Sequence, residues 1–117
     1  MFARAESTKF YLYATYIDLR GSINSLVQHV SSLLVKEPQS GDVYLFYNRN
    51  RDKLKALFWD GNGFVLYYKR MERRKFIISK LLTGEINISS EECQLLLSGF
   101  DFMIKREFNS CDFSKYF

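Results

Sequence analysis

The side chains of this chain that could do chemistry are three aspartates, one histidine and one of two cysteines. Asp42, Asp52 and Asp60 could together bind a divalent metal, as in nucleases. Asp52 and Asp60 fall at expected turns, however, where aspartate is favoured because it hydrogen-bonds the local backbone. His29 has no recognisable catalytic motif around it, and Cys93 falls on the apolar stripe of an expected helix. The sequence therefore predicts a protein that is not an enzyme, with no catalytic residue, metal or cofactor.

Positive charge is concentrated in one stretch of the chain. Between Arg49 and Lys75 there are nine basic residues and three acidic ones, so the segment carries +6 in a chain of net charge +4. Such a patch raises the local concentration of polyanions and speeds encounter with nucleic acid. Alternatively, the charges keep an aromatic-rich domain soluble and protect a sheet edge. Composition alone leaves both interpretations open.

Three β-strands are expected to position these cations, over Val43–Asn48, Lys53–Asp60 and Phe64–Arg70, because these runs are rich in aromatic and other β-forming residues. Arg49–Asp52 has a turn-like composition and separates the first two strands, and a glycine-rich turn separates the other two. Strands joined by short turns pair antiparallel. The segment therefore predicts an antiparallel β-meander.

The register of the second hairpin decides which cations face one another. An Asn-Gly pair is the strongest short-range signal for a tight hairpin turn. With Asn62-Gly63 at the centre of a type I′ turn, Lys55 lies opposite Arg70, and a bound anion would relieve the repulsion between them. With the turn one residue earlier, Lys55 faces Tyr68, which gives weaker support for a bound anion.

Two helices are expected to cover the strands. Ser22–Val35 has apolar residues at helical spacing, and either Asp18 or Ser22 could cap it. The second helix, Ser90–Ser98, begins with a Ser-x-x-Glu capping box at Ser89. Both helices have one apolar stripe with which to contact a sheet.

Two further segments have β character. Lys9–Ile17 is expected to be a strand that docks on the meander, and Phe76–Ser79 could add another strand edge. Ile86–Ile88 leads into the second helix. The expected fold is thus α+β, with an antiparallel β-meander of three to five strands covered by two main helices.

The 117 residues suit a single domain, 1–117, with one core. Residues 1–8 are expected to form a loose N-terminus, and residues 102–117 a C-terminal tail. Neither a signal peptide nor a membrane-spanning run is recognisable, and two cysteines do not make a disulfide framework. We therefore expect a cytoplasmic protein without membrane association.

The central stretch resembles the small accessory protein of the insertion sequence 66 family, which is encoded by the second reading frame of these transposable elements and often labelled TnpB. The likeness covers about Tyr11–Asp101. It includes Asp18-Leu19-Arg20 before the first helix and Leu96–Asp101 after the second. The matching central positions are Ser40, Gly41, Phe46, Asn48, Arg49, Lys55, Leu57, Trp59, Asp60, Gly61, Gly63, Phe64, Tyr68, Lys69, Arg70, Glu72 and Phe76.

The resemblance implies a non-catalytic protein that is needed for transposition, a form of DNA recombination, beside a separate DDE-type transposase. We expect it to bind transposon-end DNA, or the transposase–DNA complex, through the basic hairpin. The expected phosphate contacts are Lys55, Lys69, Arg70, Arg73, Arg74 and Lys75.

Other residues of the motif are expected to shape the hairpin or to contact bases. The structural positions are Trp59, Asp60, Gly61, Gly63, Phe64 and Tyr68. Trp59, Tyr67 and Tyr68 could stack on an exposed base, although filling the core is the favoured role of Trp59. The alternative function is a protein–protein adaptor for the transposase that makes no direct DNA contact. The sequence does not predict the oligomeric state.

Overall fold

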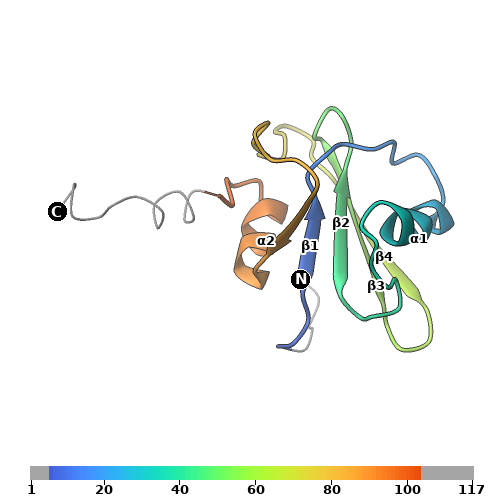
Figure 1. Ribbon diagram of the computed structural model, residues 1–117. Coiled ribbons are helices and arrows are strands. Elements are labelled where there is room, and N and C mark those ends of the chain that lie inside the picture. The colour runs from blue at the N-terminus through green and yellow to red at the C-terminus, as the bar shows by residue number, and fades with distance from the viewer. Residues whose placement is uncertain (1–5, 104–117) are drawn as a thin grey trace.

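Five strands and two helices follow one another in the computed structural model, which describes residues 6–103 (Figure 1). In chain order they are β1 (Phe10–Tyr13), α1 (Ile23–Ser32), β2 (Val43–Tyr47), β3 (Lys53–Trp59), β4 (Phe64–Arg70), β5 (Glu85–Ile88) and α2 (Ser90–Leu97). The α+β class expected from the sequence is confirmed.

The sheet is mixed, and this corrects the antiparallel arrangement expected from the sequence. Its strand order is β4-β3-β2-β1-β5, and β1 pairs parallel with β2 while every other pair is antiparallel. The reason is the connection between β1 and β2, which contains α1. A crossover with a helix returns the chain to the end of the sheet where the first strand began, whereas a short turn reverses its direction.

The three strands of the basic segment form close to their expected bounds. β2 and β3 each end one residue earlier than expected, and β4 has the expected limits. β3 pairs antiparallel with β2 on one side and with β4 on the other. It is therefore an interior strand, while β4 lies at one end of the sheet order.

The turn between β3 and β4 is centred on Gly61-Asn62, so the type I′ turn expected at Asn62-Gly63 is wrong. Gly61 has a φ of 78°, whereas Asn62 is not among the residues with positive φ. A positive φ at the first central residue alone is the pattern of a type II′ turn, which favours glycine there. The backbone N–H of Asp60 donates to the carbonyl oxygen of Gly63 across the turn, at 2.8 Å.

This turn fixes the register of the hairpin. Lys55 lies opposite Tyr68, so the alternative register is confirmed and the pairing of Lys55 with Arg70 is wrong. Lys53 lies opposite Arg70 instead. Each of these two cations has a carboxylate partner, at 3.8 Å for Lys53 and 2.8 Å for Arg70. Repulsion within this pair therefore gives no evidence for a bound anion.

Each face of the sheet carries its own apolar cluster, because successive side chains of a strand point to opposite faces. Leu12 and Leu45 point to the face that α2 covers, where Leu96 joins them. Tyr44 and the apolar side of α1 belong to the cluster on the other face. Figure 1 shows the two helices on opposite sides of the sheet.

The two helices begin in different ways. Ser22 is the N-cap of α1, yet its side chain makes no capping hydrogen bond. At α2 the expected capping box is confirmed: Ser89 Oγ accepts from the Glu92 N–H, and the Ser89 N–H donates to Glu92 Oε1. Gly99 ends α2 with a φ of 84°, as its position after the helix predicts. α1 is shorter than expected and ends at Ser32.

Two segments differ from the sequence-based expectation. Phe76–Ser79 is not a strand. Its Phe76 side chain is buried, and the Phe76 N–H donates to the carbonyl oxygen of Arg51 at 2.7 Å. Ile86–Ile88, which was expected only to lead into a helix, belongs to β5 and pairs with β1. Both segments are short apolar runs, whose partners in the tertiary structure decide their conformation.

The expected C-terminal tail begins inside the core, because Phe102 is fully buried in the cluster on the α2 face. The remainder of that expected tail, residues 104–117, and residues 1–5 of the expected loose N-terminus lie outside the described residues. Within residues 6–103, no helix is long and apolar enough to cross a membrane.

Candidate nucleic-acid interface

The six cations expected from the sequence to contact phosphates do not share one surface. Lys55 and Arg70 lie on the α1 face of the hairpin, whereas Lys69 lies on the α2 face, opposite the core residue Leu54. The exposed loop after β4 carries the other three: Arg73, Arg74 and Lys75. Alternation along β4 therefore divides a charge run that is continuous in the sequence.

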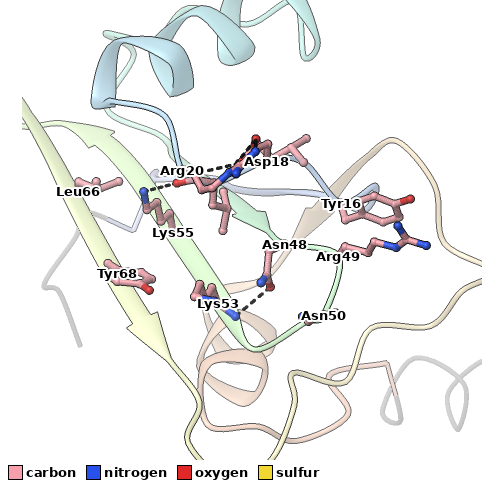
Figure 2. Close-up of a pocket in the computed structure, with 12 residues that line it drawn as sticks. Tyr16, Asp18, Arg20, Asn48, Arg49, Asn50, Lys53, Lys55, Leu66 and Tyr68 are labelled. Atoms are coloured by element: carbon pink, nitrogen blue, oxygen red, sulfur yellow. Dashed lines mark hydrogen bonds and ion pairs between the residues drawn. The ribbon is translucent and has the colours of Figure 1, made fainter.

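An open groove of about 950 Å³ lies on the α1 face, beside the hairpin (Figure 2). Its walls come from residues 16–20 before α1, residues 48–50 between β2 and β3, and side chains of β3 and β4. The lining residues are Tyr16, Ile17, Asp18, Leu19, Arg20, Asn48, Arg49, Asn50, Lys53, Lys55, Leu66 and Tyr68. The groove thus depends on tertiary structure, since its walls are far apart in the sequence.

The side chain of Asn48 holds the turn between β2 and β3. Its Oδ1 accepts hydrogen bonds from the backbone N–H groups of Asp52 and Lys53, at 3.2 and 3.0 Å. Its Nδ2 donates to Asp52 Oδ1 at 2.6 Å, and this hydrogen bond is the main reason why the pKa of Asp52 is lowered. Arg51 takes a positive φ of 58° within the turn. These bonds fix the backbone on which Arg49 and Asn50 are carried.

The segment 16–20 is held against the sheet from two sides. The backbone N–H of Ile17 donates to the carbonyl oxygen of Tyr47 at 3.0 Å, and Leu19 is buried in the cluster under α1. The ammonium of Lys55 donates to the carbonyl oxygen of Leu19 at 2.6 Å, as the dashed line in Figure 2 shows. Lys55 therefore joins two walls of the groove and supplies positive charge there.

The electrostatic balance of the groove is positive. Its lining includes four cations, Arg20, Arg49, Lys53 and Lys55, and a single carboxylate, that of Asp18. Arg20 donates to both carboxylate oxygens of Asp18, with its closest contact, from Nη2 to Oδ2, at 2.7 Å. These hydrogen bonds lower the pKa of Asp18 to about 2. The lining residues together carry a net charge of +3.

Two tyrosines flank the groove, and each lies near a cation. The Cζ atom of Arg49 lies 5.9 Å from the ring centroid of Tyr16, and Nζ of Lys55 lies 5.5 Å from that of Tyr68. Both distances are close to the 6 Å limit of a cation–π interaction. Tyr16 and Tyr68 are 52% and 50% exposed, so a large part of each side chain remains accessible to a ligand.

On the opposite face, the cations contact the end of α2. Nζ of Lys69 donates to the carbonyl oxygen of Leu97, the last residue of the helix, at 2.6 Å. A cation at this position satisfies a terminal carbonyl group and interacts favourably with the helix dipole. Arg74 lies beside the ring of Phe100, with its Cζ 6.0 Å from the ring centroid. On the α2 face, Lys69 and Arg74 thus interact with other groups of the protein.

The expected structural residues lie at the tip of the hairpin, except Tyr68, which lines the groove. The rings of Trp59 and Phe64 pack edge to face, with their centroids 5.0 Å apart. Gly61 has the positive φ that its turn requires, and Asp60 and Gly63 close that turn. Tyr67 points to the α2 face and packs against the core there, so it is not part of the groove.

The candidate catalytic residues lie apart from one another. Asp42 accepts a hydrogen bond from the backbone N–H of Lys9 at 3.0 Å, whereas Asp52 is bound by Asn48. Among residues 6–103, no group of three histidine, cysteine or acidic side chains could hold a metal ion. Burial raises the pKa of the Cys93 thiol to about 12, which disfavours the nucleophilic thiolate.

The sequence-based site missed much of the groove. Arg20, Arg49 and Lys53 are groove cations that were not assigned to the site, and Tyr16 is an unassigned aromatic residue. A signal was available for two of them, because Asp18-Leu19-Arg20 and Asn48-Arg49 both carry the family resemblance. No local pattern signals Tyr16, since only the fold brings it beside Arg49.

Comparisons with known proteins agree with the resemblance. Residues 8–107 match the family described as IS66 Orf2 like protein. The uncharacterized protein y4jC of Sinorhizobium fredii is 37% identical over 92 residues, which cover 78% of this chain and 79% of that protein. The uncharacterized protein y4hO of the same organism is 29% identical over 107 residues, covering 92% and 93%. No solved structure matches this chain.

Proposed function

The chain belongs to the IS66 Orf2-like family, and on that premise we propose that it is a non-catalytic accessory protein that binds transposon DNA. The proposed binding surface is the groove beside the β3–β4 hairpin, defined by its lining residues above. The DNA would be bound either directly or within the transposase–DNA complex. The relatives y4jC and y4hO bear names that state no activity, so the proposal rests on family membership and on the chemistry of the groove.

One observation carries this proposal: residues of the family motif from three separate segments meet at a single cationic groove. Asp18-Leu19-Arg20 comes from before α1, Asn48-Arg49 from the turn after β2, and Lys55 and Tyr68 from the hairpin. If these residues met in an apolar cluster, packing of the core would explain why they lie together. The groove is instead open and carries net positive charge, so core packing does not explain it. A phosphate backbone is the partner that such a surface fits.

Protection of a sheet edge explains these cations less well. A strand needs charged residues for this purpose when its hydrogen-bonding edge is open, and β4 is the terminal strand on this side. Lys53 and Lys55, however, lie on β3, which is paired on both sides. Their charges therefore cannot serve an edge, and their position beside Arg49 favours anion binding.

The proposed phosphate contacts form two groups. Arg49, Lys53 and Lys55 line the groove, and Arg70 lies on the same face of β4, opposite Lys53. The exposed Arg73 and Lys75, in the loop after β4, could extend this surface for a longer ligand. We assign the other two expected contacts to the α2 side of the sheet instead, because Lys69 bonds the last residue of α2 and Arg74 lies beside Phe100, just after that helix.

Fluorescence anisotropy with labelled transposon-end duplex over a salt series tests the proposal. The logarithm of affinity should fall with the logarithm of salt concentration by about 0.9 for each phosphate neutralised. The double variant Arg49→Ala/Lys53→Ala should bind more weakly. Because each lost phosphate contact reduces the slope by roughly one unit, the slope of this variant should be smaller by roughly two units. The matched control is Arg74→Ala/Lys80→Ala, which removes the same charge from positions outside the groove lining.

Two results would count against the proposal. Equal losses in the two double variants would mean that net charge, rather than the groove, determines binding. No binding of duplex or single-stranded DNA at low salt would reject direct DNA contact. The adaptor function would then be tested by measuring binding of the same variants to the transposase of the element.

A further inference from the structure

The geometry of the groove points to unpaired DNA, rather than intact duplex, as its preferred ligand. We infer that bases of a single-stranded or locally opened segment stack on Tyr16 and Tyr68 while their phosphates contact the neighbouring cations. This inference rests on the proposed DNA-binding function and names the form of DNA that the groove selects.

The first reason is that each half-exposed tyrosine has its own cation. Arg49 lies beside Tyr16, and Lys55 lies beside Tyr68, at 5.9 and 5.5 Å from the ring centroids. A nucleotide offers a flat base for the ring and a phosphate for the cation. Proteins that bind single strands combine these two features, with aromatic side chains for the bases and a basic groove for the backbone.

The second reason is that part of the groove lining is apolar. Ile17 and Leu66 are half-buried and line the groove together with the cations, whereas the third apolar lining residue, Leu19, is buried under α1. The phosphates of a duplex would gain nothing from covering these side chains, because an anion loses hydration against an apolar surface. The flat faces of unpaired bases, by contrast, are apolar enough to replace water there.

The third reason is that intact duplex hides the surfaces that the tyrosines would contact. In B-form DNA the bases are stacked on one another and present only their edges in the grooves. A ring such as that of Tyr68 can reach a base face only if the base leaves the stack. The duplex could use the cations of the groove but neither of its aromatic rings.

The structure also selects among the aromatic residues considered from the sequence. Tyr67 packs into the core on the α2 face, and Trp59 packs edge to face against Phe64 at the tip of the hairpin. Neither residue lines the groove. Tyr68 is thus the member of that set that is placed for stacking, and Tyr16 joins it from another segment.

Anisotropy measurements with three labelled probes of equal length test this inference: a single strand, its perfect duplex, and the same duplex with a central unpaired bubble. The protein should bind the single strand and the bubble at least about tenfold more tightly than the duplex. Tyr16→Leu and Tyr68→Leu each keep an apolar side chain but remove the π face. Each should weaken single-strand binding about 5- to 140-fold, the effect of losing one base–aromatic stack, and leave duplex binding nearly unchanged.

The matched control is Phe100→Leu. Phe100 is 54% exposed and lies beside Arg74, so it shares the exposure and cationic neighbour of the groove tyrosines, yet it lies at the end of α2. Its substitution should leave binding of all three probes unchanged. Thermal unfolding of each variant shows whether the fold is intact, as expected for substitutions of half-exposed side chains.

The possible failures are distinguishable. Equal affinity for single strand and duplex, with wild-type binding by both tyrosine variants, would overturn the inference and leave the proposed function standing. No binding of any probe would reject the proposed function itself. Polyglutamate that displaces the single strand as well as unlabelled single strand does would show recognition of charge alone, and would overturn the inference too.

Discussion

On the α2 face of the β3–β4 hairpin, side chains pack against a helix end and a closed core, whereas on the α1 face the same two strands line an open groove. Lys69 and Tyr67 belong to the first surface, and the adjacent Tyr68 and Arg70 belong to the second. The sequence composition of the two sets is almost the same. Their roles differ because alternate residues of a strand point to different surroundings.

The comparison shows how a charged segment can serve stability and binding at once. Lys69 donates to the carbonyl oxygen of Leu97, and Lys55 donates to that of Leu19, both at 2.6 Å. The first bond ends a helix over a filled core, while the second joins two walls of the groove. Counting charge along the chain treats these lysines as equivalent, although Lys55 lines the groove and Lys69 does not.

The largest difference between the two faces should appear in the free energy of unfolding. Phe102 is fully buried on the α2 face, so Phe102→Ala should cost about 3–5 kcal/mol in urea unfolding. Tyr68 is half-exposed on the α1 face, and Tyr68→Ala should cost less than about 0.5 kcal/mol. Phe102→Leu, which leaves less empty volume, is the milder substitution if Phe102→Ala does not fold. Similar costs for Tyr68→Ala and Phe102→Ala would contradict the division into a closed face and an open one.

Cysteine reactivity should report the closure of the α2 face directly. Burial raises the pKa of Cys93 from 9.0 to about 12, which lowers its thiolate fraction at neutral pH by about a thousandfold. In a Cys111→Ser background, where Cys93 is the remaining thiol, iodoacetamide should react very slowly with native protein. Addition of urea should restore the rate of an ordinary cysteine. A native rate equal to the unfolded one would mean that the core beneath α2 is open.

Much of the fold was predictable because its signals are local. The three strands of the basic segment and the capping box at Ser89 follow from residue patterns within a few positions. The parallel pairing of β1 with β2 was not predicted, because strand direction depends on the path of a long connection. The helix expected between these two strands could nevertheless have indicated a crossover connection, and with it a parallel pair.

The candidate site was predictable only in part. The cationic hairpin is visible in the sequence, and Lys55 and Tyr68 do line the groove. The register was resolved by the turn at Gly61-Asn62, and a shift of one residue there changes which side chains face each other. Tyr16 could not be assigned, because its proximity to the hairpin is a tertiary contact of a segment far away in sequence.

A pair of matched lysine substitutions should sharpen the comparison. Lys69→Met keeps the aliphatic stem but removes the cation at the end of α2, so it should cost about 1 kcal/mol of stability with little effect on DNA affinity. Lys55→Met should cost a similar amount and also weaken DNA binding, because its charge lies in the groove. For each variant, urea unfolding measures the change in stability and fluorescence anisotropy measures the change in DNA affinity. Loss of DNA affinity in Lys69→Met as large as in Lys55→Met would remove the distinction between the faces.

The smallest expected effect, that of Ser22→Ala, appears when the starts of the two helices are compared. Ser89 Oγ accepts from the Glu92 N–H at 3.0 Å, so Ser89→Ala should destabilise the protein by about 0.5–2 kcal/mol. The Ser22 side chain makes no such bond, and Ser22→Ala should cost no more than a few tenths of a kcal/mol. The groove wall formed by residues 16–20, shortly before α1, is held by Lys55 and by the sheet, and no side-chain cap at Ser22 contributes to it. Urea unfolding of the two alanine variants measures this asymmetry, and equal costs would show that the start of α1 is fixed as firmly as that of α2.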